Sequence, residues 1–256
     1  NVRRLATGEL DMAIVHAPTA VAAYQGIGIF KGKKRARNIR VIAKLYEAGI
    51  TIYTLKKTGI KTLSDLAGKQ VSGGPPGSGS IKNMKLILKV LGLMDKVKIK
   101  YFSYADQTNA LRDGHVDVVA QNSAPVPHVL AIEAQRPLQW IEFTQGEAEA
   151  FARAYPGFRP GYYKAGTYKS MTMNYRTPKD TVYWAVQDRL PNDIVYSTLK
   201  SIYKPRYKKL LPRINKALKG FGPGLADAKV DGFKMHPGAI RYYKEQGLKI
   251  PSEIIP

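Results

Sequence analysis

Ser72-Gly73-Gly74-Pro75-Pro76-Gly77-Ser78-Gly79-Ser80 is a glycine-rich loop between two apolar segments. Gln70-Val71 leads into the loop, and apolar residues recur at helical spacing from Ile81 to Leu91 after it. This order predicts a strand, a loop and a helix. The first N–H groups of such a helix, together with its dipole, favour an anion, so residues 77–80 are candidate contacts for a carboxylate or phosphate. The alternative is a tight turn in which Ser80 caps the helix, and the spacing leaves both interpretations open.

The loop does not have the spacing of nucleotide-binding glycine loops. A P-loop requires Lys and then Ser or Thr after its second glycine, whereas Ser80 and Ile81 follow Gly79. The Rossmann fingerprint is also absent, because Gly74, Gly77 and Gly79 run in the reverse order. A bound anion is therefore expected to be something other than a nucleotide phosphate in a standard motif.

Charge is the second informative feature of this chain of 256 residues, whose net charge is +22 and whose pI is near 10.0. Such a charge favours a polyanion, an anionic membrane surface or small anionic ligands as partners. The densest basic runs lie at residues 31–40 and 204–219, but basic residues occur along the whole chain. We therefore interpret each run as a solvated basic surface and expect no specific nucleic-acid site.

Composition sets further limits on the class of protein. A hydrophobic content of 44% suits one or two globular domains, and no apolar run is long enough to span a membrane. The absence of cysteine excludes disulfides, thiolate zinc sites and a cysteine nucleophile. The polar stretch after Asn1 is unlike the apolar part of a signal peptide, although a trimmed exported protein would look the same.

Two segments of the sequence echo each other. Residues 5–16 and 111–122 each read as a helix end, a glycine, a hydrophobic-Asp pair and a short apolar strand. The echo indicates two similarly built α/β lobes. One strand ends at His16 and the other at Gln121 and Asn122, and ligands of open α/β sheets bind beyond such strand ends. Asp11 and Asp117 occupy equivalent turns, which favours structural roles for both.

The remaining segments alternate between strand and helix, which predicts an α/β fold. We expect strands at 39–45, 50–55, 96–102 and 138–143, and helices at 104–111, 125–134, 192–203, 206–219 and 237–246. Residues 156–163 are rich in Pro, Gly and aromatic residues and read as a loop. The strand at 10–15 has no earlier strand to pair with, so we expect that an N-terminal strand and helix are missing from the sequence.

No catalytic or metal-binding motif is recognisable. The four histidines, His16, His115, His128 and His236, lack partners at metal-ligand spacing, and no nucleophile elbow occurs. We expect neither enzymatic activity nor a cofactor nor a bound metal. An enzyme built on the same fold stays open as an alternative.

Four segments together resemble the TAXI-type solute-binding proteins of TRAP (tripartite ATP-independent periplasmic) transporters. They are residues 59–80, residues 8–11, residues 110–117 and, most specifically, the stretch His236-Pro237-Gly238-Ala239-Ile240-Arg241-Tyr242-Tyr243-Lys244-Glu245-Gln246-Gly247. The resemblance implies a periplasmic or extracytoplasmic, monomeric binding protein with a type II two-lobed fold and a ligand cleft between the lobes. It also implies TRAP membrane subunits as partners and a small carboxylate as ligand, such as a glutamate-like amino acid or 2-oxoglutarate.

On this resemblance we expect lobe I to comprise residues 1–62 and 173–256 and lobe II residues 63–172, with closure of the lobes around the ligand. The family often has Gln or a similar amide where this chain has His16, so ligand preference or its pH dependence is expected to differ. The predicted ligand contacts are His16, Tyr46, Gly77, Ser78, Gly79, Ser80, Gln121, Asn122 and Tyr168. The competing hypothesis is a binder of nucleic acid or another polyanion that uses the +22 surface.

Overall fold

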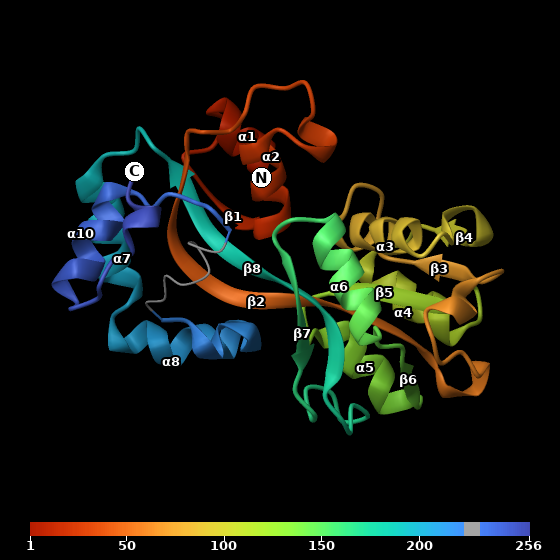
Figure 1. Cartoon of the computed structure of the whole chain (residues 1–256). Coiled ribbons are helices and arrows are strands. Elements are labelled where there is room, and N and C mark those ends of the chain that lie inside the picture. Colours follow the sequence, from red (N-terminus) through yellow and green to blue (C-terminus); the bar gives the residue numbers. More distant parts are fainter. Residues whose placement is uncertain (223–230) are drawn as a thin grey trace. The chain divides into compact units, whose positions relative to one another are not determined.

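The computed structural model describes residues 1–222 and 231–256, and within them the chain forms two compact units (Figure 1). The first unit contains Asn1–Glu47 and Asp180–Pro256, and the second contains Ala48–Lys179. The sequence placed the boundaries at 62/63 and 172/173, whereas the units divide at 47/48 and 179/180. The reason is that the chain leaves one unit and enters the other inside two long strands, β2 (Ile39–Leu55) and β8 (Tyr175–Gln187), instead of in loops.

In the first unit, β1 (Met12–His16) pairs antiparallel with the second half of β8, so that Met12 faces Val186 and His16 faces Val182. β1 therefore has a partner from the far end of the sequence. The helices of this unit are α1 (Val2–Thr7), α2 (Ala17–Gln25), α7 (Asn192–Ile202), α8 (Pro205–Ile214) and α10 (Pro237–Glu245). Short 3-10 turns lie at Gly28–Phe30, Lys216–Gly220 and Ser252–Ile254.

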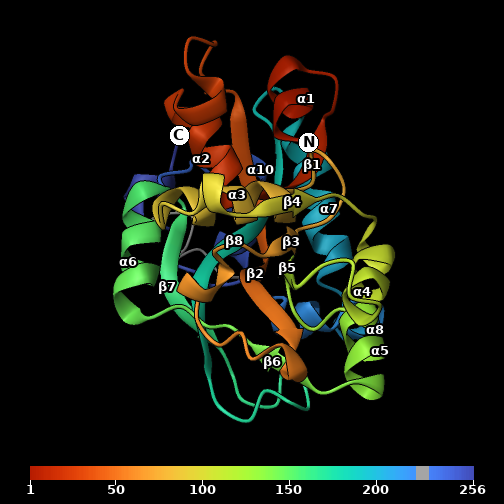
Figure 2. The ribbon, with the colours of Figure 1, turned by 90° about the vertical axis from the view of Figure 1, so that its right-hand side faces the viewer.

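The second unit is a mixed sheet with helices on both faces (Figure 2). Its strands are the later part of β2, β3 (Gln70–Ser72), β4 (Lys98–Lys100), β5 (Val118–Asn122), β6 (Leu138–Trp140), β7 (Phe158–Tyr163) and the start of β8. Its helices are α3 (Gly79–Val90), α4 (Tyr104–Arg112), α5 (Pro127–Gln135) and α6 (Gln145–Ala154). Strand β3 runs parallel to β4 and β5, and β2 runs antiparallel to β5 and β6.

Alternation along the strands gives the second unit two cores. Val118 and Ala120 of β5 pack with the apolar stripes of α3 and α6, whereas Val119 packs with those of α4 and α5. Successive strand residues point to opposite faces, so a strand covered on both sides carries a nearly continuous apolar run. Figure 2 shows α6 on one side of the strands and α4 and α5 on the other.

The predicted α/β class is confirmed, with an open mixed sheet. The helices expected near 104–111, 125–134, 192–203 and 237–246 are all present. The helix expected over 206–219 ends at Ile214, and a 3-10 turn follows. Two strands predicted at 39–45 and 50–55 are one strand, because Ala48 and Gly49 are buried inside it and do not form a turn.

The loop predicted at 156–163 is wrong, because most of it is strand β7. Glycine at position 161 leaves room for the side chain of Lys179, because a Cβ there would lie 2.9 Å from its Cδ. The Tyr163 hydroxyl at the end of β7 accepts a hydrogen bond from Gly49 N–H at 2.7 Å. Strand β8 was not predicted at all, although Val182, Tyr183 and Val186 in its second half are buried.

Helix α10 approaches α7 closely at Gly238, which is buried in the first turn of α10. A Cβ at this position would collide with the carbonyl oxygen of Asn192 at the start of α7. Backbone cannot move aside as a flexible side chain can, so only glycine fits here.

We expect Gly238→Ala to lower the free energy of unfolding by about 1–3 kcal/mol through this collision. Gly146→Ala is the matched control, since Gly146 also lies in the first turn of a helix and a Cβ there meets nothing within 4 Å. The control should be neutral or stabilising by about 0.5–1 kcal/mol. Urea unfolding of both variants measures the difference, and equal stabilities would contradict the steric argument.

Candidate functional site

The glycine-rich loop connects β3 to α3, as the sequence predicts, but a different serine caps the helix. Ser78 is the N-cap, and its Oγ accepts a hydrogen bond from Ile81 N–H at 3.3 Å. The same hydroxyl donates to the carbonyl oxygen of Gly73 at 3.2 Å. Ser80 lies inside the first turn, so the expectation that Ser80 caps α3 is wrong. The helix begins two residues earlier than that interpretation requires.

Two glycines of the loop allow close packing. A Cβ at Gly73 would lie 2.7 Å from Cα of Ile81, and one at Gly74 would lie 2.7 Å from the ring of Tyr104. Gly74 also has φ of 101°, which disfavours other residues. The loop is therefore held against the start of α3 and against α4.

Ser80 fastens α3 to the end of β5. Its Oγ accepts a hydrogen bond from the backbone N–H of Asn122 at 3.0 Å, and its side chain is buried. One turn further along α3, the Asn83 side-chain amide donates to Oδ1 of Asn122 at 3.1 Å. The carboxyl ends of β3 and β5 and the N-terminus of α3 thus meet at one place.

Three hydrogen-bond donors remain unused at this place, and we call them the loop site: the N–H groups of Gly79 and Ser80 and the side-chain NH₂ of Asn122. None has an acceptor among residues 1–222 and 231–256. The Asn122 amide faces Gly79 closely, since a Cβ on Gly79 would lie 3.1 Å from its Nδ2. Gly79 is exposed. The loop site therefore offers donors, but no acceptor, to a ligand.

Behind the loop site a buried polar network surrounds Gln121. Its Oε1 accepts from Gln107 Nε2 and from His128 Nε2, both at 3.2 Å, and its Nε2 donates to the carbonyl oxygen of Asn122. Tyr104 stacks on His128, with ring centroids 6.1 Å apart. The network holds α4 and α5 against β5 and uses both ends of the Gln121 amide, so Gln121 supports the site from behind.

The sequence did not single out Gln107, Asn83 or His128 as site residues. Gln107 had a detectable signal, because it lies on the same face of α4 as the buried Ala110 and Leu111. A polar residue on an apolar helix face needs a buried partner. Its partner, however, comes from a strand that is distant in sequence.

Tyr168 lies in the core of the second unit. It is 1% exposed, its ring stacks on Trp140 at 4.7 Å, and its hydroxyl accepts from Val126 N–H at 2.9 Å. Burial raises the pKa of this phenol. These contacts favour a packing role for Tyr168.

His16 and Tyr46 belong to the first unit, and the other predicted contacts belong to the second. His16 ends β1, as predicted, and its Nδ1 lies 2.7 Å from Oδ2 of Asp180, whose side chain is buried. Tyr46 was expected at a strand end but lies in the middle of β2, where it is half-buried. The two aspartates of the sequence echo are structural, since Asp11 pairs with Arg189 and Asp117 accepts from Gln70 N–H.

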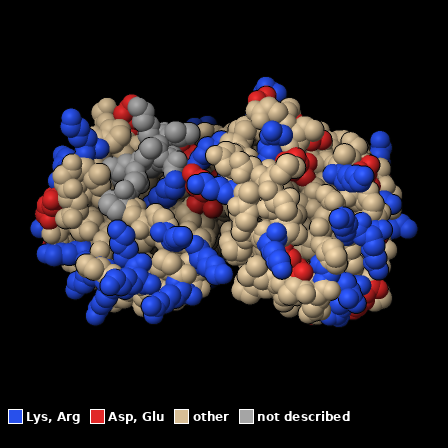
Figure 3. Space-filling model, turned by 90° about the horizontal axis from the view of Figure 1, so that it is seen from below, with Lys and Arg blue, Asp and Glu red and all other residues tan. Residues whose placement is uncertain are grey.

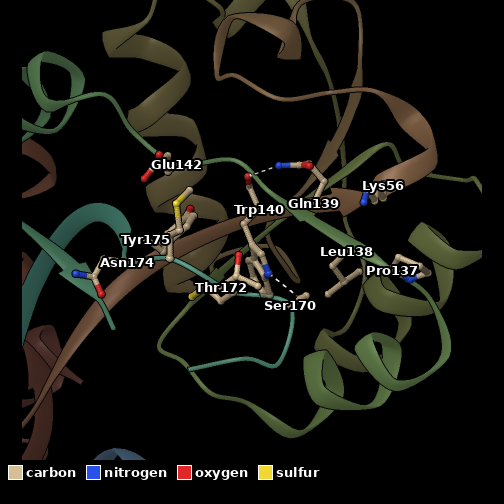
Figure 4. Close-up of a pocket in the computed structure, with 12 residues that line it drawn as sticks. Lys56, Pro137, Leu138, Gln139, Trp140, Glu142, Ser170, Thr172, Asn174 and Tyr175 are labelled. Carbon is tan, nitrogen blue, oxygen red and sulfur yellow. Dashed lines mark hydrogen bonds between the residues drawn. The ribbon is translucent and has the colours of Figure 1, made fainter. Parts of the chain in front are cut away.

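The second unit also has a pocket of about 420 Å³ beside β6, lined by Trp140, Ser170 and Asn174 among others (Figure 4). Two of its donors are already used: Trp140 Nε1 donates to Ser170 Oγ at 2.9 Å, and Gln139 Nε2 donates to the Trp140 carbonyl oxygen at 3.0 Å. None of the predicted ligand contacts lines it. The loop site is the stronger candidate, because it combines predicted ligand contacts with a strand end and a helix N-terminus.

Two further properties concern the described residues alone. They contain no group of three or more His, Asp or Glu side chains arranged to hold a metal ion. Neither do they contain a helix with the length and apolar character needed to cross a bilayer.

The chain belongs to the NMT1-like family, whose sequence profile matches residues 1–247. The narrower TAXI-type assignment stays a prediction. A solved structure from Bordetella bronchiseptica RB50 is similar in fold, with a TM-score of 0.51, 15% identity, and coverage of 96% of this chain and 84% of that one.

Two weaker structural matches are to binding proteins. The periplasmic aliphatic sulphonate binding protein SsuA from Escherichia coli has 15% identity, covers 99% and 81% of the two chains, and has a TM-score of 0.45. The arginine-, lysine-, histidine-binding protein ArtJ from Geobacillus stearothermophilus has 14% identity, coverage of 89% and 78%, and a TM-score of 0.47.

Replacing Ser78 and replacing Ser80 should both lower stability, but only one of the changes should expose the Asn122 amide to exchange. Ser80→Ala leaves the N–H of Asn122 without an acceptor and should cost about 1–3 kcal/mol of unfolding free energy. Ser78→Ala removes the cap and should cost about 0.5–2 kcal/mol. Amide hydrogen exchange separates them, because only Ser80→Ala should deprotect the Asn122 amide. Loss of its protection in both variants would show that the cap, and not Ser80, holds β5.

Burial lowers the pKa of His128, which sits in the network as a neutral ring. The unfolded chain has the ordinary pKa near 6.5, so it takes up the proton at higher pH than the folded chain does. This stability is complete above about pH 6.5 and is lost as pH falls through the lower folded pKa. Urea unfolding from about pH 7.5 to about pH 5 should show the decline, and His128→Gln should show a smaller one. His236, whose pKa burial also lowers, is common to both proteins and cancels. An equal decline in the two would remove His128 as its source.

Proposed function

We propose that this protein is an extracytoplasmic solute-binding protein that captures a small organic anion through the loop site and delivers it to a TRAP membrane transporter. The observation that carries the proposal is the set of unused donors at Gly79, Ser80 and Asn122, gathered where parallel strands end and a helix begins. In open α/β sheets this is where ligands bind. The TAXI-type resemblance supports the transporter and the carboxylate ligand.

The electrostatics of the loop site favour an anion. Hydrogen bonds to a charged acceptor contribute about 1.5–3 kcal/mol each, and the helix dipole adds about 0.3–1 kcal/mol. The same N–H groups and helix dipole disfavour a cation. These donors select an anion over a cation. They do not select a carboxylate over a sulphonate, because both groups present oxygen acceptors.

The net charge of +22 acts in the same direction over a longer range. A positive surface raises the local concentration of small anions and their association rate, and salt weakens the effect. It also attracts polyanions, which keeps a nucleic-acid or polyanion binder as the second candidate function.

Thermal-shift screening tests the proposed ligand class. The panel comprises amino acids, 2-oxoacids, dicarboxylates, sulphonates and duplex DNA. At least one small organic anion should stabilise the protein, by roughly 2.7 kcal/mol at about 100 times its dissociation constant. Stabilisation by DNA alone, still present at about 200 mM salt, would support the polyanion binder instead.

Two variants then test whether the loop site holds the anion of whichever ligand is found. Asn122→Asp keeps the acceptor for Asn83 but replaces the NH₂ donor by an anionic oxygen, and Gly79→Val fills the space in front of that donor. Calorimetric titration should show a loss of at least about tenfold in affinity for each, equivalent to about 1.4 kcal/mol. Gly146→Ala, on the open surface of α6, should bind as the wild type does. Unchanged affinity in both site variants would move the anion elsewhere.

A further inference from the structure

Helix α8 (Pro205–Ile214) and the 3-10 turn η5 (Lys216–Gly220) carry a surface that the proposed solute site does not use. No residue of α8 is buried, and its principal neighbour in the described part of the chain is η5. A helix of this length is marginal on its own, and Pro212 in its interior removes one of its hydrogen bonds. The helix therefore gains little stability from the rest of the described protein.

The charge of this surface has one sign. No Asp or Glu occurs from Ile194 to Gly222, while α8, its N-cap and η5 carry seven exposed cations, which we call the α8 basic surface: Lys204, Arg206, Lys208, Lys209, Arg213, Lys216 and Lys219. None of them pairs with a carboxylate of the residues that the structure describes. Figure 3 looks onto α8 and shows lysines and arginines crowded on that part of the surface.

An apolar stripe runs beside these cations. Tyr207, Leu210, Leu211 and Ile214 follow the spacing of one helix face, and Leu210 and Ile214 are 44% and 71% exposed. Cations alone would suit any polyanion. Exposed aliphatic side chains next to them instead fit a surface that has anionic groups above hydrocarbon.

We propose that α8 docks on the surface of an anionic lipid bilayer, with Leu210 and Ile214 entering the headgroup region and the α8 basic surface contacting the lipid phosphates. A short amphipathic helix with a cationic polar face and an aliphatic apolar face binds in this way. The inference is independent of the solute site, which lies in the other unit. Its consequence is that α8 holds the first unit at a membrane face.

Vesicle flotation with the full chain tests the proposal. Vesicles of phosphatidylcholine and phosphatidylglycerol in about a three-to-one ratio should retain the protein, and phosphatidylcholine alone should not. Lys208→Glu with Lys209→Glu should lower partitioning at least about tenfold. Leu210→Ser with Ile214→Ser should lower it about as much and should leave the melting temperature unchanged, since α8 has no buried residue.

Two control variants test whether membrane binding depends on this particular surface, and not merely on net charge or on any exposed aliphatic side chain. Lys33→Glu with Lys34→Glu makes the same change in net charge on another exposed basic run, and Ile29→Ser removes an aliphatic side chain that is 57% exposed elsewhere. Both should partition as the wild type does. Three results would overturn the proposal: an equal loss in the charge control, no loss in Leu210→Ser with Ile214→Ser, or duplex DNA displacing the protein from vesicles and binding through the same residues.

Discussion

The hydrogen bond from the Asn122 backbone to the Ser80 hydroxyl is the interaction on which the candidate site depends. It joins the first turn of α3 to the last residue of β5, through two residues that are 42 positions apart in the chain. With this bond in place Gly79 lies beside the Asn122 amide, since a Cβ on Gly79 would lie 3.1 Å from Nδ2 of Asn122. Without it the loop would still form a capped turn, but the strand end and the helix end would not act on one ligand.

The polar network around Gln121 explains how this edge of the sheet stays in place. Buried amides are costly unless every donor and acceptor is used, and here Gln107 and His128 satisfy the amide oxygen while Asn122 satisfies the amide nitrogen. Such a network specifies one arrangement of α4, α5 and β5. The rigidity behind the loop site is the counterpart of the unused donors in front of it, of which Gly79 is the exposed one.

The sequence predicts the parts of this site that are local and misses those that are not. Glycines and serines between an apolar strand and an amphipathic helix predicted the loop. The rule that ligands bind beyond the ends of strands pointed to Gln121 and Asn122. The capping serine was misassigned because Ser78 and Ser80 are both plausible caps by spacing, and only the bond from Asn122 removes Ser80 from that role. Gly161 was read as part of a loop but lies in β7, and the break expected before residue 50 is absent because Gly49 lies inside β2, where a Cβ would be 3.0 Å from the side chains of Tyr163 and Thr177. Contacts of that kind involve residues more than a hundred positions apart, or at least from a separate strand, and no local pattern records them.

The way the chain is divided between the two units determines the order in which they can fold during synthesis. The second unit is one uninterrupted stretch, so it can complete its two cores as soon as Lys179 has left the ribosome. The first unit cannot, because β1 must wait for β8, whose pairing residues follow some 170 positions later. Until then β1 lacks the strand with which it pairs, and unpaired strand edges are prone to aggregation. Nascent chains arrested before Asp180 would therefore contain a folded second unit and an incomplete, aggregation-prone first unit.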